Sequence, residues 1–281
     1  MVATGNLGYV KYVTGFDDNG NPILKDFGLG AVVNSVNLRY EAIRTVGVGC
    51  REPLTLSPGR LSANWNVSFV LSDLTTLAIL VQDFGILADK PNAIGVEFKG
   101  SGIQYLGYDL TNKKLFSYVN RLSISSRVGE VVRVGVDGIS KTLAVGTGSG
   151  DTNCDVDATP VTFVESSVKV GGSSDIGGYV RGFSVTINGN VEPIYALGSE
   201  MFVDVIGRVM AFSGRMTVVL DGIDLYNDLL NSGNTTVEFV LSNNESILFN
   251  VARIEEISSR LMPGEVVEAD VAIVGTKVGI S

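Results

Sequence analysis

Residues that could carry chemistry are sparse in this chain, which has 281 residues and no histidine. Histidine is the usual general base and a common metal ligand, so its absence excludes Ser/His/Asp and Cys/His arrangements. A carboxylate pair, as in glycosidases, remains open, but the spacing of the acidic residues singles out no pair. We therefore predict a protein that is not an enzyme, with no catalytic, cofactor-binding or metal-binding residues.

The pattern nearest to a metal site is DTNCDVD, which places oxygen-bearing side chains at alternate positions: Asp151, Asn153, Asp155 and Asp157. A calcium loop of this type needs glycine at its sixth position and a bidentate glutamate at its twelfth. Val156 and Thr162 stand there instead. The glycine-rich GTGSGD just before it lacks the Lys-Ser/Thr of a phosphate loop. Both segments are better explained as an acidic, flexible linker.

Composition narrows the function classes further. The net charge is −9 and the pI about 4.6, with no cluster of Lys and Arg that could hold duplex DNA. Two distant cysteines, Cys50 and Cys154, favour free thiols in a reducing compartment. The N-terminus lacks signal-peptide features, and Asp73 and Asp83 interrupt the most apolar stretch. We expect a soluble protein made in a cytoplasm.

Most of the chain alternates between apolar and polar residues, as antiparallel strands do. In LSANWNVSFVL one face would carry Ala63, Trp65, Val67, Phe69 and Leu71. In EVVRVGVDG it would carry Val132, Val134 and Val136. The clusters DDNGNP, FKGSG, INGN and LSNNES predict hairpin turns, since Asn and Gly tolerate positive φ. The fold class is therefore mainly β, as a sandwich or barrel.

Two helices are expected between long strands. SDLTTLAILVQDF follows a strand ending at Leu71 and offers Ser72 or Asp73 as a cap. DGIDLYNDLLNSG follows a strand ending at Leu220 and offers Asp221 or Asp224. Each segment carries an apolar stripe at helical spacing.

The chain repeats itself at about half its length. ISSRVGEVVRV (124–134) is echoed by ISSRLMPGEVVEA (257–269), GVEFKG by TVEFVL, and GRLSANWNVSFVLSD (59–73) by GRVMAFSGRMTVVLD (207–221). In the last strand we match three apolar positions with three others: Val132, Val134 and Val136 with Val267, Ala269 and Val271. If GR is aligned with GR, the apolar alternations of the strands that follow are one residue out of phase. A β-bulge in one copy would explain this, and so would a wrong local alignment.

The echo predicts two tandem antiparallel β-domains, each with one packed helix. We assign residues 1–30 to an N-terminal hairpin or arm of the first domain and 31–145 to that domain. Residues 146–177 form a linker and hairpin, and 178–281 the second domain. VTFVESSVKVGGSSD, before the second copy, is the counterpart of the N-terminal hairpin.

The element order resembles the bacteriophage tail tube proteins, related to the inner tubes of contractile injection systems and to baseplate hub proteins. SFVLSDLTTLAIL and TVVLDGIDLYNDLL each look like that family's long strand and Leu-rich helix. The resemblance implies a structural virion protein that stacks as homo-oligomeric rings, trimers or hexamers, around DNA that passes without specific binding. It implies as partners the tape measure protein and, in some tails, sheath and baseplate proteins; no membrane is involved.

Alternatives remain at this point. Within the assembly class, a baseplate hub or tail-terminus protein would form one closed ring and stop. A β-sandwich adhesin or carbohydrate binder would expose aromatic clusters at loop tips, and only scattered residues such as Tyr105 and Tyr108 lie near turns. Four arginines recur as the last residue of GR and ISSR. They are candidates for intersubunit ion pairs; the alternative is that they are solvated strand-end charges of little energetic weight. They are Arg60, Arg127, Arg208 and Arg260.

Overall fold

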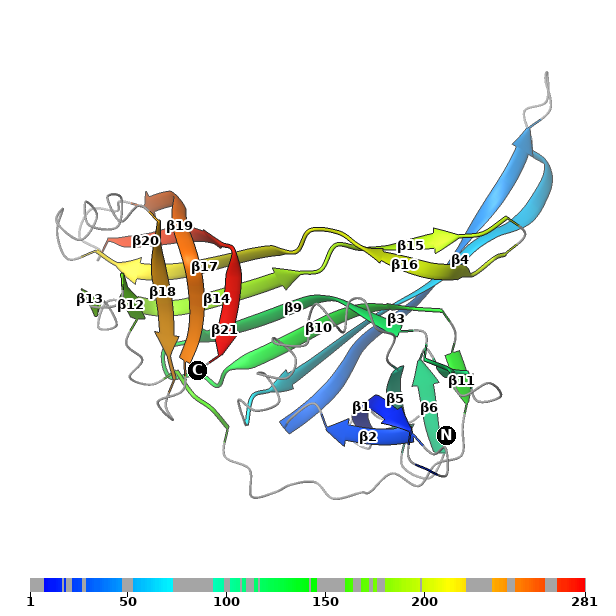
Figure 1. Cartoon of the computed structure of the whole chain (residues 1–281), viewed down its shortest axis with the longest axis horizontal. Coiled ribbons are helices and arrows are strands. Elements are labelled where there is room, and N and C mark those ends of the chain that lie inside the picture. The colour runs from blue at the N-terminus through cyan, green and yellow to red at the C-terminus, as the bar shows by residue number, and fades with distance from the viewer. Residues whose placement is uncertain are drawn as a thin grey trace.

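A computed structural model of the chain contains twenty-one strands, and no helix occurs in its described part (Figure 1). The described residues are 8–16, 18, 22–26, 29–46, 53–72, 93–98, 102–106, 108–109, 114–115, 117–141, 143–145, 160–163, 168–171, 174–175, 180–197, 199–220, 234–241, 246–260 and 267–280. Both expected helices and the DTNCDVD segment lie outside them. The mainly β, antiparallel fold class is confirmed.

The first half of the chain supplies eleven strands. They are β1 (Gly8–Phe16), β2 (Pro22–Asp26), β3 (Leu29–Val46), β4 (Pro53–Val70), β5 (Ala93–Phe98), β6 (Gly102–Leu106), β7 (Tyr108–Asp109), β8 (Lys114–Leu115), β9 (Ser117–Arg127), β10 (Arg133–Ser140) and β11 (Leu143–Val145). The second half supplies β12 (Val168–Val170), β13 (Ser174–Asp175), β14 (Val180–Asn188), β15 (Val191–Tyr195), β16 (Phe202–Gly207), β17 (Ala211–Val219), β18 (Asn234–Val240), β19 (Ser246–Arg260), β20 (Glu268–Gly275) and β21 (Lys277–Ile280).

One large sheet runs through both halves of the chain. Its strands follow the order β13-β12-β18-β19-β20-β17-β14-β9-β10-β4-β3, and β21 pairs with β19. A smaller sheet of the first half has the order β11-β6-β5-β1-β2. The joint between the halves is the antiparallel pairing of β14 with β9. The two halves therefore share a continuous hydrogen-bonded ladder.

The strand order of the first half recurs in the second. β9-β10-β4-β3 is answered by β19-β20-β17-β14. The small sheet β11-β6-β5-β1-β2 is answered by β21, the N-terminal part of β19, β18, β12 and β13. In the second half one unbroken strand, β19, corresponds to both β6 and β9. The strands that correspond to the two sheets of the first half therefore belong to a single sheet. The segment VTFVESSVKVGGSSD does supply the counterpart of the β1–β2 hairpin, because β12 pairs β18 as β1 pairs β5.

The register of the strand ladders shows which residues of the two halves occupy equivalent positions. Ile124 lies opposite Val134, and Ile257 lies opposite Val271. If the two ISSR segments are equivalent, Val134 corresponds to Val271, which lies two positions beyond the expected Ala269. A shift of two residues leaves every side chain on the same face of the sheet. Val134 lies opposite Phe69, and Val271 lies opposite Met216. The sequence separation of Phe69 and Met216 is one residue less than that of the two GR glycines. The one-residue difference in phase is therefore present in the ladders, and both explanations stay open, because the second copy bends at residues 208–210 where β4 is continuous.

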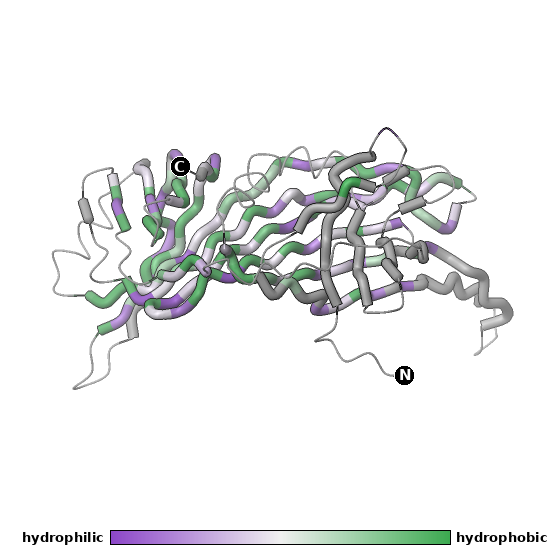
Figure 2. Tube along the Cα trace, turned by 90° about the horizontal axis from the view of Figure 1, so that it is seen from below, coloured by the Kyte–Doolittle hydropathy of each residue, from purple (hydrophilic) through white to green (hydrophobic). Residues whose placement is uncertain are grey.

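Alternation explains the core. The five apolar residues predicted on one face of β4 and its end are all buried, and Val132, Val134 and Val136 are buried with them. Apolar and polar positions alternate along the strands of the large sheet (Figure 2). The main apolar cluster joins both halves, with Phe163, Phe183, Phe239 and Phe249 in contact with one another in series. The halves are therefore packed around a common core.

Three of the four predicted hairpin turns are confirmed and one is wrong. DDNGNP joins β1 to β2, FKGSG joins β5 to β6, and LSNNES joins β18 to β19. INGN instead marks a bend between β14 and β15. There the N–H of Gly189 donates to the carbonyl of Asn120 at 2.7 Å, and Asn190 has φ 48°. Asn190 N–H also donates to Oδ1 of Asn188 at 3.1 Å, so the positive-φ residue Asn190 redirects the chain without reversing it.

Candidate assembly surface

The large sheet has a polar face opposite its core. Asn64, Asn66, Ser123 and Asp137 lie on it, and Nδ2 of Asn66 donates to Oδ1 of Asp137 at 2.5 Å. Small polar side chains joined across strands keep this face hydrated and free of apolar patches. In its described part this face is therefore a hydrated surface of small polar groups.

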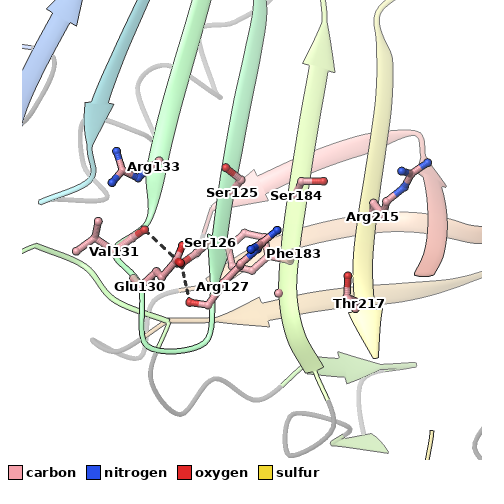
Figure 3. Close-up of a pocket in the computed structure, with 11 residues that line it drawn as sticks. Ser125, Ser126, Arg127, Glu130, Val131, Arg133, Phe183, Ser184, Arg215 and Thr217 are labelled. Carbon is pink, nitrogen blue, oxygen red and sulfur yellow. Dashed lines mark hydrogen bonds between the residues drawn. The ribbon is translucent and has the colours of Figure 1, made fainter. Parts of the chain in front are cut away.

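A shallow depression of about 320 Å³ lies on the polar face near the joint between the halves (Figure 3). Three arginines line it, from β9, β10 and β17: Arg127, Arg133 and Arg215. The Ser126 hydroxyl beneath them donates to the carbonyl of Glu130 at 3.1 Å. The lining contains one acidic residue, Glu130, and thus no carboxylate pair. The depression therefore does not provide the acid and base of a glycosidase.

The second half carries an arm built from two strand pairs in series. β14 pairs with β17, the chain bends at residues 189–190 and 208–210, and β15 pairs with β16 beyond the bend. In strand order this arm is the counterpart of the long β3–β4 hairpin. The arm crosses the first half of the chain and reaches β4, where the N–H of Leu61 donates to the carbonyl of Glu200 at 2.7 Å (Figure 1).

A small apolar cluster anchors one face of the arm. Tyr118, Val191 and Phe202 are buried together, and the rings of Tyr118 and Phe202 meet edge to face with centroids 6.2 Å apart. Oδ1 of Asn120 accepts the N–H of Val191 at 2.8 Å. Burial, and secondarily the negative charge of Asp204, raise the pKa of the Tyr118 hydroxyl above its ordinary value. The arm is thus fixed against β9.

The arm also exposes large apolar side chains. Of the ten exposed large hydrophobic side chains in the described residues, six belong to the arm: Ile194, Leu197, Val203, Ile206, Val209 and Met210. Leu197 at the tip is 108% exposed and Val209 at the bend is 88% exposed. A concentration of this kind marks an interaction surface rather than the scattered apolar exposure of any protein. The sequence analysis missed it, although the run VIGRVM lacks the alternation of a half-buried strand.

The four candidate arginines lie apart from one another. Arg60 sits over the ring of Tyr195, with its Cζ 4.8 Å from the ring centroid, so it ties β4 to the arm. Arg208 forms an ion pair with Glu192 across β15 and β16. Arg127 lines the depression on the polar face, and Arg260 ends β19 opposite Glu268. Their role in intersubunit ion pairs stays a prediction, and two of them have partners within the chain.

The described residues contain neither a metal-binding cluster nor a membrane-spanning helix. No group of three or more Cys, Asp or Glu side chains there is placed to hold a metal ion. No helix there has the length and hydropathy needed to cross a membrane.

Comparison with known proteins gives a family match. The family model described as "Phage tail tube protein" matches residues 13–280, nearly the whole chain. No curated protein matches the chain.

Proposed function

From the premise that the chain belongs to the phage tail tube protein family, we propose that it polymerises as stacked rings into a hollow conduit for DNA. Membership makes it a structural component of the virion tail. The single observation that carries the polymer is the concentration of exposed apolar side chains on the arm. An apolar surface of that kind needs a partner, and a tube supplies one in every subunit.

We further propose that the two halves are tandem copies of one tube domain. Support comes from the strand order, which repeats through both sheets. Three chains would then present six similar units around a ring, whereas six chains would each span two layers. The continuous sheet favours the trimer, because side-by-side copies within one chain already follow the direction in which a ring closes.

In this proposal the polar face of the large sheet lines the lumen. Its charges are mixed, with the exposed Arg121, Arg133 and Arg215 beside the exposed Asp270 and the half-buried Asp137. DNA would then slide over a hydrated surface of small polar groups, while repulsion would come from the acidic charge of the chain as a whole. A tape measure protein would occupy the lumen before DNA does, and sheath and baseplate proteins are partners where the tail has them.

A baseplate hub or tail-terminus protein is the second candidate, since a duplicated tube domain also suits a ring that does not stack. Light scattering of the purified protein over a concentration series, with negative-stain electron microscopy, separates the candidates. Rods that lengthen with concentration support the tube, and rings of one fixed mass support the hub. A monomer at every concentration would refute both.

A further inference from the structure

We infer that β3 of one chain pairs with the C-terminal part of β19 of the next chain, residues 254–260, repeating between chains the joint that links the two halves within a chain. This inference rests on the proposed ring assembly. It identifies the two strand edges that meet and the register in which they meet.

The intrachain joint supplies the template. Residues 182–188 of β14 pair antiparallel with residues 121–127 of β9, and the contact ends beside Asn120. In the repeated order, β14 ends the set β19-β20-β17-β14 of the second copy, and β9 begins the set β9-β10-β4-β3 of the first copy. The joint is therefore head to tail, which is the geometry that closes rings or grows filaments.

The counterpart of β14 in the first copy is β3, and it lies at the end of the sheet. β3 pairs with β4 on one side, and no strand of the described residues pairs with its other side. Val36 on β3 is 38% exposed, among the exposed large hydrophobic residues. Among the described residues β3 is thus an eighteen-residue edge strand, and such an edge is a template for pairing with another chain.

The counterpart of β9 in the second copy is the C-terminal part of β19. On the side that corresponds to β14, β18 pairs only with residues 246–253 of β19. Residues 254–260 pair with β20 on the opposite side and, among the described residues, with no strand on the β18 side. With the two ISSR segments superimposed, this open stretch coincides with the part of β9 that β14 covers.

The open part of β19 has features that oppose non-specific aggregation of the unassembled chain. Glu255 and Glu256 are exposed on the open part of β19, and the register shift between Ile254 and Glu256 marks a β-bulge there. Charges and bulges on an edge oppose pairing with unrelated strands and with a second copy of the same edge. Only a strand with the matching twist and register fits, and within this chain β14 already shows that such a strand fits β9.

Cysteine pairs test the inference. The intrachain pair Thr186–Ser123 corresponds to Ser35 on β3 and Glu256 on β19. The variants are made in a chain with Cys50→Ser and Cys154→Ser, so that only the new cysteines react. Mild oxidation of assembled Ser35→Cys/Glu256→Cys protein should give a ladder of covalent multimers on non-reducing gels, ending at the ring number. The matched control keeps Ser35→Cys and moves its partner to Ser213, an exposed serine of β17, which is paired on both sides; it should give at least tenfold less multimer.

The outcomes separate this inference from the proposed tube. Mixing the two single-cysteine variants should give only a heterologous dimer, and each variant alone should give monomer. Rods in the microscope without β3–β19 cross-links, or dimers from Ser35→Cys alone, would overturn the edge pairing and leave the tube intact. Protein that stays monomeric and uncross-linked at every concentration would overturn both.

Discussion

The indole N–H of Trp65 donates a hydrogen bond to the hydroxyl of Ser117 at 2.8 Å, in the buried layer where β4 and β9 lie on either side of β10. Trp65 is the only tryptophan and is 2% exposed. The Ser117 hydroxyl lies 3.4 Å from the carbonyl of Ile139, to which it donates. Ser117 thus provides the hydrogen-bond acceptor for the buried indole N–H of Trp65, the largest side chain of the core.

Ser117→Ala should destabilise the chain by about 1–3 kcal/mol, because it leaves a buried N–H without an acceptor. Urea unfolding followed by the fluorescence of Trp65 measures the change. The control Ser125→Ala removes an exposed hydroxyl from the same strand and should stay within about 0.5 kcal/mol of the parent. Equal effects from the two substitutions would contradict the role assigned to Ser117.

Gly138→Ala should destabilise the chain by about 1–3 kcal/mol through overpacking. A Cβ at Gly138 would lie 2.0 Å from Cζ2 of Trp65 and 2.6 Å from the backbone oxygen of Tyr118. Gly279→Ala is the matched control, because its Cβ would meet nothing within 4 Å. Thermal unfolding of the two variants decides the matter, and an undisturbed melting temperature for Gly138→Ala would show that the Trp65 ring does not cover this residue.

The free energy of unfolding should fall as the pH rises above about 10, in part through Tyr118. Its folded-state pKa is raised, so the folded chain holds the phenolic proton more tightly than the unfolded chain. That stabilisation is fully present below the unfolded pKa of 10.0 and is lost as the pH rises through the folded pKa. Tyr118→Phe removes the titrating group, so denaturant unfolding at about pH 8 and pH 11 should show a smaller loss in the variant. An identical loss would exclude Tyr118 as its source.

Leu197→Asp should block assembly without unfolding the chain. The side chain is fully exposed at the tip of the arm, so stability should change by less than about 0.5 kcal/mol. Burial of a leucine contributes about 1.5–3 kcal/mol, so the protein concentration needed for assembly should rise roughly tenfold to a hundredfold. Val128→Asp, at a 47% exposed valine in the β9–β10 turn, is the control. Equal loss of assembly in both variants, measured by light scattering, would remove the arm from the interface.

Local pattern was enough to predict the strands and most of the turns. Alternation placed Trp65, Val67 and Phe69 on the buried face, because one face of each strand packs against a single core. FKGSG and LSNNES made hairpins because alternating strands flank them. INGN was wrong for a reason outside its own residues: the N–H groups of Gly189 and Val191 donate to the carbonyl and Oδ1 of Asn120, so the chain bends there and runs on as β15 without reversing.

Relations between distant strands were harder to predict. The echo of ISSR indicated a repeat, and β9 and β19 do occupy equivalent places in the strand order. It could not indicate that the halves share one sheet, because the β14–β9 pairing depends on backbone edges that no side-chain pattern encodes. The exposed apolar side chains of the arm were not predicted, because in the sequence an exposed Ile, Val or Leu cannot be told from one in the core.

The most direct test of the account is the structure of the wild-type assembly by electron cryo-microscopy. The account predicts a hollow tube in which the two halves of each chain alternate around one ring, the polar face of the large sheet lines the lumen and β3 meets residues 254–260 of the next chain. Halves stacked along the tube axis, or an assembly without a lumen, would contradict it.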